Sequence, residues 1–119
     1  MEKINLAKKL ALFQERWSPK IVAEVNDTHV KLTKLQGEFD WHRHELEDEL
    51  FLILKGRLQI QFKDHDVWLE EGDMIVVPHG VPHRPVAPEE VHVLLIEPRG
   101  TVNTGNLDED DRSTAGEWI

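Results

Sequence analysis

One stretch of sequence decides the fold: FDWHRHELEDEL at residues 39–50. On an extended chain successive side chains alternate between two faces, so His42 and His44 point one way and Arg43 points the other. Glu49 follows a short acidic turn at the start of the next apolar run, and a hairpin there would bring its carboxylate back beside the two imidazoles. Two histidines and a carboxylate on one face predict a metal site that still lacks a fourth ligand.

A second stretch, residues 72–83, supplies the candidate for that ligand. It begins with a Gly72-Asp73 turn, continues as a β-branched run and ends in a Pro-His-Gly corner before His83. A neighbouring strand of a closed sheet would place His83 opposite the histidine pair. The two stretches are therefore expected to meet in space.

Read together, the two stretches resemble the paired motifs of the cupin superfamily, specifically those of a small single-domain cupin. Two departures are visible: the first gap is one residue shorter than usual, and Ala87 stands where the family commonly has Asn. The resemblance implies an all-β fold, a double-stranded β-helix or jelly-roll barrel, with one amphipathic helix before it. The first motif reads Gly37, His42, His44, Glu49, Gly56; the second reads Gly72, Pro78, Gly80, His83.

The implied ligand set is His42, His44, Glu49 and His83 around one divalent transition metal ion. Three neutral imidazoles and one carboxylate leave such an ion partly positive, so it remains a Lewis acid. The same ligands suit manganese, iron, nickel, copper or zinc, and the identity of the metal stays open. A five- or six-coordinate ion would keep positions for water or substrate. The alternative to a metal site is a cupin pocket that binds no metal.

Composition narrows the class of protein. A chain of 119 residues is expected to form one domain, residues 1–119, and the absence of cysteine leaves only nitrogen and oxygen as metal ligands. Lysines interrupt the apolar residues of the N-terminus, so we expect neither a signal peptide nor a membrane span, and a cytoplasmic protein. The formal net charge of −9 repels nucleic acid and anionic membranes, and neither is an expected partner.

The hydrophobic pattern predicts one helix followed by strands. Apolar residues recur at helical spacing over residues 5–17, with Asn5 as N-cap and Ser18-Pro19 as the stop. We divide the chain into a helical arm (1–20), a β-barrel (21–100) and a C-terminal segment (101–119) that is either an acidic tail or an edge-covering arm. This segment contains the acidic cluster Asp108 to Asp111, with Trp118 as an anchor. The expected strands are 21–25, 29–35, 39–44, 49–54, 58–62, 67–69, 74–77, 83–86 and 91–97.

Alternation also predicts the pocket. If Glu49 faces inward, so do Phe51 and Ile53, which would form an apolar wall beside the metal. On the last strand the charge of Glu97 favours an outward side chain, which turns His92 inward as a substrate contact or proton shuttle, with a neutral core histidine as the alternative. Asp40 shares the parity of His42 and reaches the pocket mouth, unless it is a turn carboxylate. His29, His65 and His79 are expected to be solvated.

Two function classes fit these features. The first is a metal-dependent enzyme, an isomerase, lyase or dioxygenase, that acts on a small oxygen-rich molecule such as a sugar, keto acid or diol. The second is a non-catalytic binding or sensory module that uses the metal as an anchor. No catalytic residue is assigned. The last strand is apolar on both faces over residues 91–95, so its outer face needs cover from a second copy of the chain or from the N-terminal helix. Many single-domain cupins are homodimers, so a homodimer is expected.

Overall fold

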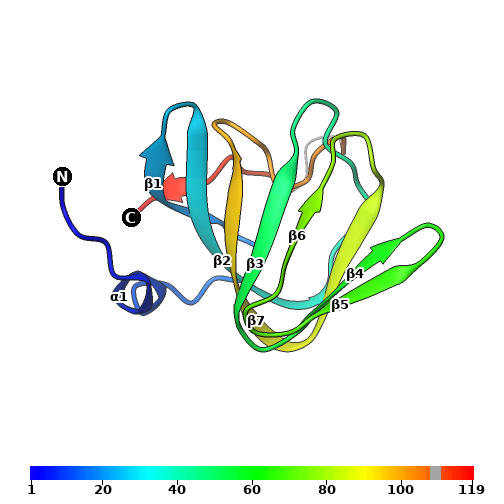
Figure 1. Ribbon diagram of the computed structural model, residues 1–119, viewed down its shortest axis with the longest axis horizontal. Helices are drawn as coiled ribbons and strands as arrows, with labels where there is room; N and C mark the ends of the chain where they lie inside the picture. The colour runs from blue at the N-terminus through cyan, green and yellow to red at the C-terminus, as the bar shows by residue number, and fades with distance from the viewer. Residues whose placement is uncertain (108–110) are drawn as a thin grey trace.

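The computed structural model describes residues 1–107 and 111–119, and it is almost entirely β-structure (Figure 1). Of the predicted acidic cluster Asp108 to Asp111, only Asp111 lies within the described residues. The elements are α1 (Leu6–Leu10), β1 (Lys20–Val25), β2 (Thr28–Glu38), β3 (Glu49–Lys55), β4 (Leu58–Phe62), β5 (Asp66–Leu69), β6 (Met74–Val77), β7 (His83–Pro98) and β8 (Glu117–Trp118).

The long strand β7 organises the sheet. Along one side it pairs with β2 from Thr28↔Pro98 to Glu38↔Val86. Along its other side it pairs with β4 near its start and with β3 near its end, and β3 in turn pairs with β6. The predicted jelly-roll fold is confirmed, but the sheet is not closed: among the described strands, β5 and β6 each pair on one side only, and their outer edges stay open.

Two predicted strand boundaries are wrong. Residues 83–86 and 91–97 belong to the single strand β7, because the exposed residues 88–90 bulge outward while the ladder with β2 resumes on both sides of them. Residues 39–44 form no strand; a single bridge between His42 and His83 and a hydrogen bond from the Phe39 N–H to Pro85 O hold them to β7. The metal motif therefore lies on a loop attached to the start of β7.

The predicted inner face of β3 is confirmed, whereas that of the last strand is wrong. Phe51 and Ile53 are buried in the main core. On β7 the odd positions face inward, so Glu97 is 3% exposed while Ile96 is 37% exposed. The physical reason is Lys31 on the neighbouring β2, whose ammonium lies 2.7 Å from Glu97 and allows the carboxyl group to be buried.

The predicted helix over residues 5–17 is much shorter in the structure. Asn5 does cap it, because its side chain accepts a hydrogen bond from the Lys8 backbone N–H. The helix ends at Leu10, where the Lys34 ammonium donates hydrogen bonds to the backbone carbonyls of Leu10 and Phe13. A longer helix would keep Phe13 on the same face as Trp17, but the structure uses these two side chains in different clusters of apolar residues.

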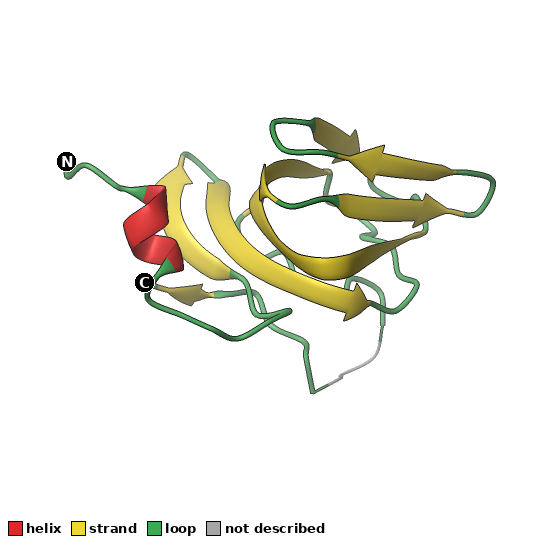
Figure 2. Cartoon of the chain, turned by 90° about the horizontal axis from the view of Figure 1, so that it is seen from below, coloured by secondary structure: helices red, strands yellow, loops and turns green. Residues whose placement is uncertain are grey.

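The C-terminal segment returns to the sheet. Strand β8 lies parallel to β1, with Lys20 opposite Glu117 and Ile21 opposite Trp118. Figure 2 shows α1 and this C-terminal segment together at one end of the molecule, away from the β4–β5 hairpin. Within the described part of the chain, no helix has the length and apolar character needed to cross a membrane.

Candidate metal centre

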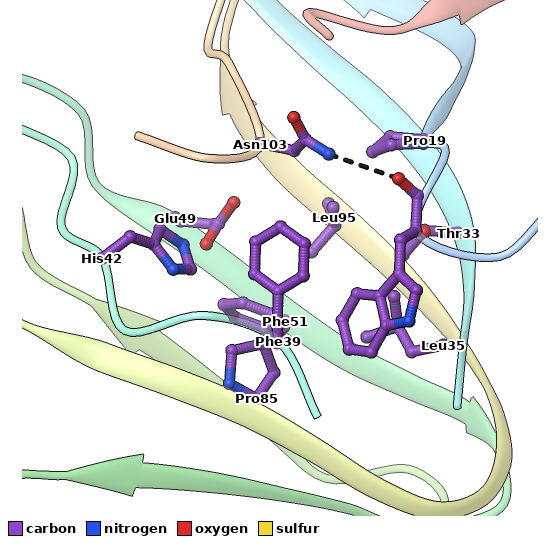
Figure 3. Close-up of a pocket in the computed structure, with 11 residues that line it drawn as sticks. Pro19, Thr33, Leu35, Phe39, His42, Glu49, Phe51, Pro85, Leu95 and Asn103 are labelled. Carbon is purple, nitrogen blue, oxygen red and sulfur yellow. Dashed lines mark hydrogen bonds between the residues drawn. The ribbon is translucent and has the colours of Figure 1, made fainter. Parts of the chain in front are cut away.

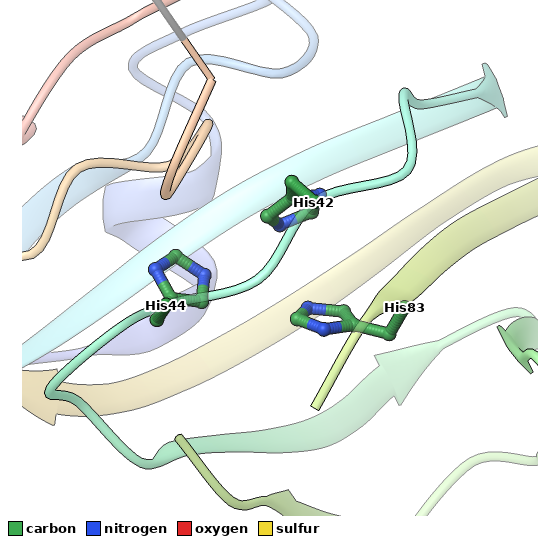
Figure 4. A group of neighbouring side chains, drawn as sticks. All are labelled: His42, His44 and His83. Carbon is green, nitrogen blue, oxygen red and sulfur yellow. The ribbon is translucent and has the colours of Figure 1, made fainter. Parts of the chain in front are cut away.

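Three buried histidines converge near the start of β7 (Figure 4). His42 and His44 come from the 39–48 loop, and His83 opens β7. One ring nitrogen from each lies within 4.8 Å of the other two, and all three residues are at most 5% exposed. The backbone bridge explains the convergence, because the N–H of His42 donates to His83 O at 3.1 Å and the N–H of His83 donates back at 2.9 Å.

Backbone carbonyls fix which nitrogen of two rings is free. The Nδ1 of His42 lies 2.9 Å from Asp40 O, and the Nδ1 of His83 lies 2.9 Å from Val81 O. A carbonyl only accepts, so each Nδ1 carries the proton and each Nε2 keeps its lone pair. His83 Nε2 and both ring nitrogens of His44 are buried with no hydrogen-bond partner among the described residues. A buried lone pair without a donor is what a metal ligand presents before it binds.

Glu49 completes the set at the first position of β3. Its Oε1 lies 3.6 Å from His44 Nε2 and 3.7 Å from His83 Nε2. Metal bonds of about 2.1 Å allow two ligands of one ion to be at most about 4.2 Å apart, so these pairs fit. The histidine separations of up to 4.8 Å are slightly wider than that limit and need only small ring movements. The residues present therefore fit one transition metal ion with three nitrogen ligands and one oxygen ligand.

Burial and nearby charges shift the pKa values of His42 and His44 in opposite directions. Burial, followed by the nearby ring of His83, lowers the pKa of His42 to about 4, so this ring is neutral at pH 7. Burial also disfavours the proton on His44, but the Glu49 carboxylate, whose Oε1 lies 3.6 Å from Nε2, outweighs burial and raises the pKa of His44. A proton therefore competes with a metal more strongly at His44 than at His42.

A second carboxyl group lies behind Glu49. Burial, followed by the charge of Glu49, raises the pKa of Glu97 well above its ordinary value. Burial has the same tendency at Glu49, but the neighbouring Glu97, His44 and His83 side chains outweigh it and hold the pKa of Glu49 well below its ordinary value. Of the two carboxyl groups, Glu97 is thus the one that holds a proton more readily.

Lys31 completes this buried group. Its ammonium donates to Thr101 O at 3.1 Å and lies 2.7 Å from Glu97 Oε1. The sequence analysis missed both Lys31 and Glu97. A signal was present, since Lys31 lies between the apolar Val30 and Leu32 and Glu97 follows the apolar residues 93–96. Charges in such places are buried only when they are paired.

The C-terminal segment clamps the histidine loop. The backbone N–H of Arg43 donates to Asn106 Oδ1 at 2.7 Å, and the N–H of Asn106 donates to Arg43 O at 2.8 Å. Gly105, at φ +58°, lies so close that a Cβ there would overlap Arg43 O and approach His42 Cδ2 to 3.2 Å. Glycine is therefore required at this position by both conformation and space.

A cavity, here called the metal-side cavity, adjoins the centre and shares His42 and Glu49 with it (Figure 3). It encloses about 370 Å³ of empty space, counting its open mouth. Trp17 and Phe39 stack at one side with ring centroids 4.8 Å apart, and the edge of Phe39 meets the His42 ring. The remaining lining residues are Pro19, Thr33, Leu35, Phe51, Pro85, Leu95 and Asn103.

The four predicted pocket residues end in four different places. Phe51 lines the metal-side cavity, and Ile53 lies in the apolar core. Asp40 is exposed and pairs with Arg112 at 2.6 Å, outside the cavity lining, although its carbonyl orients His42. The prediction for His92 is wrong: its side chain lies on the opposite face of β7 from Leu95 and pairs with Glu90.

His29 also differs from its prediction. It was expected to be solvated, but it is 6% exposed and its Nε2 lies 2.8 Å from Glu24 Oε1. The edge of its ring meets Trp118 of β8. His65 and His79 are exposed, as expected; His65 lies beside Asp64 of its own turn, and His79 beside Asp48 of the 39–48 loop.

Comparisons with known proteins point to one family. A family model described as "Cupin domain" matches residues 28–97, more than half of the chain. The uncharacterized protein YdbB of Bacillus subtilis (strain 168) is 45% identical over 64 residues, and the match spans 57% of that protein and 53% of this chain.

Two solved structures are similar over most of the chain. A cupin-2 domain containing protein from Shewanella frigidimarina shares 48% identity with a TM-score of 0.80, covering 81% of this chain and 94% of that one. Protein NMB1881 from Neisseria meningitidis shares 35% identity with a TM-score of 0.75, covering 82% and 99%.

Proposed function

The chain belongs to the cupin domain family, and from that premise we propose that it is a metal-dependent enzyme whose substrate is a small molecule with an oxygen donor. The convergence of three buried histidines on Glu49, with two of the rings oriented by backbone carbonyls, supports this proposal. A bound divalent ion would supply Lewis acidity at the closed end of the metal-side cavity. A sugar, a keto acid and a diol each carry a suitable oxygen.

The protein groups divide the remaining work. Glu49 offers one oxygen to the ion, and Glu97 holds a proton next to it. Lys31 fixes Glu97 from the other side. Both side chains are buried, so water does not reach a proton on Glu97. This arrangement gives the site one buried proton donor close to a ligand, which an isomerase or lyase requires.

A non-catalytic binding or sensory role is the second candidate, and one observation favours it. Among the described residues that line the metal-side cavity, only His42 and Glu49 have side chains suited to acid–base chemistry, and both are expected to hold the metal. Asp40 and His92, the two polar side chains predicted to reach the pocket, lie outside that lining. Turnover would then depend on Glu97 acting through Glu49.

Metal analysis tests the ligand set. We expect about one divalent ion per chain in purified protein, and its loss in His42→Ala with His83→Ala, because two of four ligands are then missing. His79→Ala is the matched control, since His79 is exposed and lies outside the cluster. Undiminished metal in the double variant would reject these ligands. Protein reconstituted with manganese, iron, nickel, copper or zinc is then screened for turnover of sugars, keto acids and diols; binding without turnover under every metal favours the sensory role.

We also propose that the protein is a homodimer. The outer face of β6 and β7 exposes Met74 (64%), Val76 (52%) and Ile96 (37%), and the outer edge of β6 has no partner among the described strands. A second copy would cover both the apolar side chains and the open edge. The formal charge of −9 argues against nucleic acid or an anionic membrane as the partner.

A further inference from the structure

The walls of the metal-side cavity are mostly apolar, although the site is expected to take an oxygen-rich molecule. Leu35, Phe51, Pro85 and Leu95 are each buried and contribute no polar side-chain atom. The mouth is flanked by aromatic rings, with Phe39 held between Trp17 on one face and the Arg112 guanidinium, whose central carbon lies 4.4 Å from the ring centroid. Only the end at His42 and Glu49 is polar (Figure 3).

Apart from the proposed metal, the walls of the cavity carry no positive charge. No lysine or arginine is among the described lining residues: Arg112 stacks on Phe39 at the mouth, and the buried Lys31 is already engaged by Glu97 and Thr101. Phosphate and carboxylate groups need such a cation or several N–H donors when they leave water. Phosphorylated sugars and polycarboxylates are therefore poor occupants of this cavity.

Two polar side chains remain in the walls, and only one of them is free. Asn103 donates to Trp17 O and Arg112 O and accepts from the Thr114 N–H, so its amide is fully used. The hydroxyl of Thr33 is buried, in a residue 2% exposed, and has no hydrogen-bond partner among the described residues. A buried hydroxyl without a partner in a cavity wall is a position where a ligand gains a hydrogen bond.

We propose that the metal-side cavity selects a small molecule with a single aromatic ring. One oxygen substituent of that molecule points to the histidine end, and a second polar substituent meets the Thr33 hydroxyl. This inference rests on the proposed metal-dependent function and narrows its substrate class from oxygen-rich molecules in general to phenol-like ones.

The number of available polar partners separates a ring from a sugar. A pentose or hexose carries a hydroxyl on nearly every carbon, but the described lining offers one free hydroxyl besides the metal end. Each hydroxyl buried without a partner weakens binding by about 5- to 150-fold. A phenol-like ring loses nothing of this kind and gains contact with Phe39 and Phe51.

Calorimetric titration of zinc-loaded and metal-free protein tests the proposal. The probes are phenol, hydroquinone, resorcinol, cyclohexanol and D-xylose. Phenol and cyclohexanol have one oxygen and similar size; because phenol is the stronger acid and binds zinc better, their difference isolates the aromatic face only in the metal-free protein. We expect phenol to bind the metal-free protein about 3- to 10-fold more tightly than cyclohexanol, and D-xylose to bind more weakly than either.

Thr33→Val tests the second contact. Valine keeps the shape of threonine on the strand, so the variant should fold. It should weaken the tighter-binding of the two benzenediols about 3- to 10-fold and leave phenol unchanged. Thr28→Val, at the start of the same strand and outside the cavity lining, is the matched control.

The outcomes separate the two proposals. Zinc binding without any preference of the metal-free protein for phenol over cyclohexanol, or with D-xylose as the tightest probe, overturns the aromatic assignment and leaves the metal function standing. Failure to bind zinc overturns the metal function, whereas a phenol preference in the metal-free protein still supports the aromatic cavity. Equal loss in Thr33→Val and Thr28→Val overturns the contact with Thr33.

Discussion

Replacing Gly105 with alanine should damage the metal centre from a position that offers no ligand. Gly105 lies on the C-terminal segment, where its φ of +58° brings the backbone against Arg43 in the middle of the His-x-His loop. An added methyl group would overlap Arg43 O and approach His42 Cδ2 to 3.2 Å. The loop or the segment must therefore move, and His42 and His44 flank the point of contact.

The cost has two parts. Alanine in a left-handed conformation loses about 1 kcal/mol relative to glycine. Separating the segment from the loop also breaks the two hydrogen bonds between Arg43 and Asn106, each with a net contribution of about 0.5 to 1.5 kcal/mol. We expect Gly105→Ala to lower the free energy of unfolding of the metal-free protein by about 2 to 4 kcal/mol. Displaced ligands should weaken zinc binding about 10-fold or more.

Gly100→Ala supplies the matched control. Gly100 has a φ of +86°, but an added Cβ there would meet nothing within 4 Å. The left-handed conformation destabilises both variants, whereas only Gly105→Ala also creates a steric overlap. The free energy of unfolding of the control should therefore fall by about 1 kcal/mol, and its zinc affinity should not change. Urea denaturation of the metal-free proteins and a competitive zinc titration measure the two quantities. Equal zinc affinity in the two variants would refute the role assigned to the C-terminal segment.

Three further results are expected. In metal-free protein, an NMR titration should show one imidazole that stays neutral until about pH 4 and is missing in His42→Gln; because the folded state then binds fewer protons than the unfolded state, this pKa contributes about 3 kcal/mol of stability that is lost as the pH falls from about 6.5 to about 4. Lys31→Met should lower the free energy of unfolding by about 3 to 5 kcal/mol in urea, and adding Glu97→Gln should recover part of the loss; no recovery would mean that the two side chains are not coupled. Sedimentation at micromolar concentration should show a dimer that Met74→Glu and Val76→Glu convert to a monomer, and a wild-type monomer would reject the dimer proposal.

The sequence predicted well what depends on local alternation. His42 and His44 are two residues apart and both turn inward, although the loop that carries them is not a strand. Glu49, Phe51 and Ile53 alternate with exposed or half-buried residues on β3 as expected. Period-two patterns report the face of a side chain correctly whenever the chain is extended, with or without a hydrogen-bonded ladder.

Prediction failed where a distant partner changed the meaning of a residue. Glu97 was expected to face solvent because a carboxylate alone is costly to bury. Since side chains alternate along a strand, this one assignment reversed the predicted face of every residue on the strand and placed His92 inside. The residue that reverses the assignment, Lys31, is 66 positions away in the sequence (97 minus 31) and meets Glu97 only through the pairing of β2 with β7. One sequence without an alignment does not reveal such a pair.

The same buried pair explains why a centre built from three separate segments can stay in place on an open sheet. Glu49 belongs to β3, which pairs with β7 on one side and on the other with β6, whose outer edge is free among the described strands. Next to Glu49, Glu97 of β7 is paired with Lys31 of β2, so the carboxylate ligand adjoins the two most extensively paired strands. Lys31 in turn donates to Thr101, at the start of the segment that clamps the His42–His44 loop through Gly105. The carboxylate ligand and the histidine loop are thus restrained through one connected set of contacts. A substitution beside Glu49 should therefore change the restraint on the histidine loop, and the reverse.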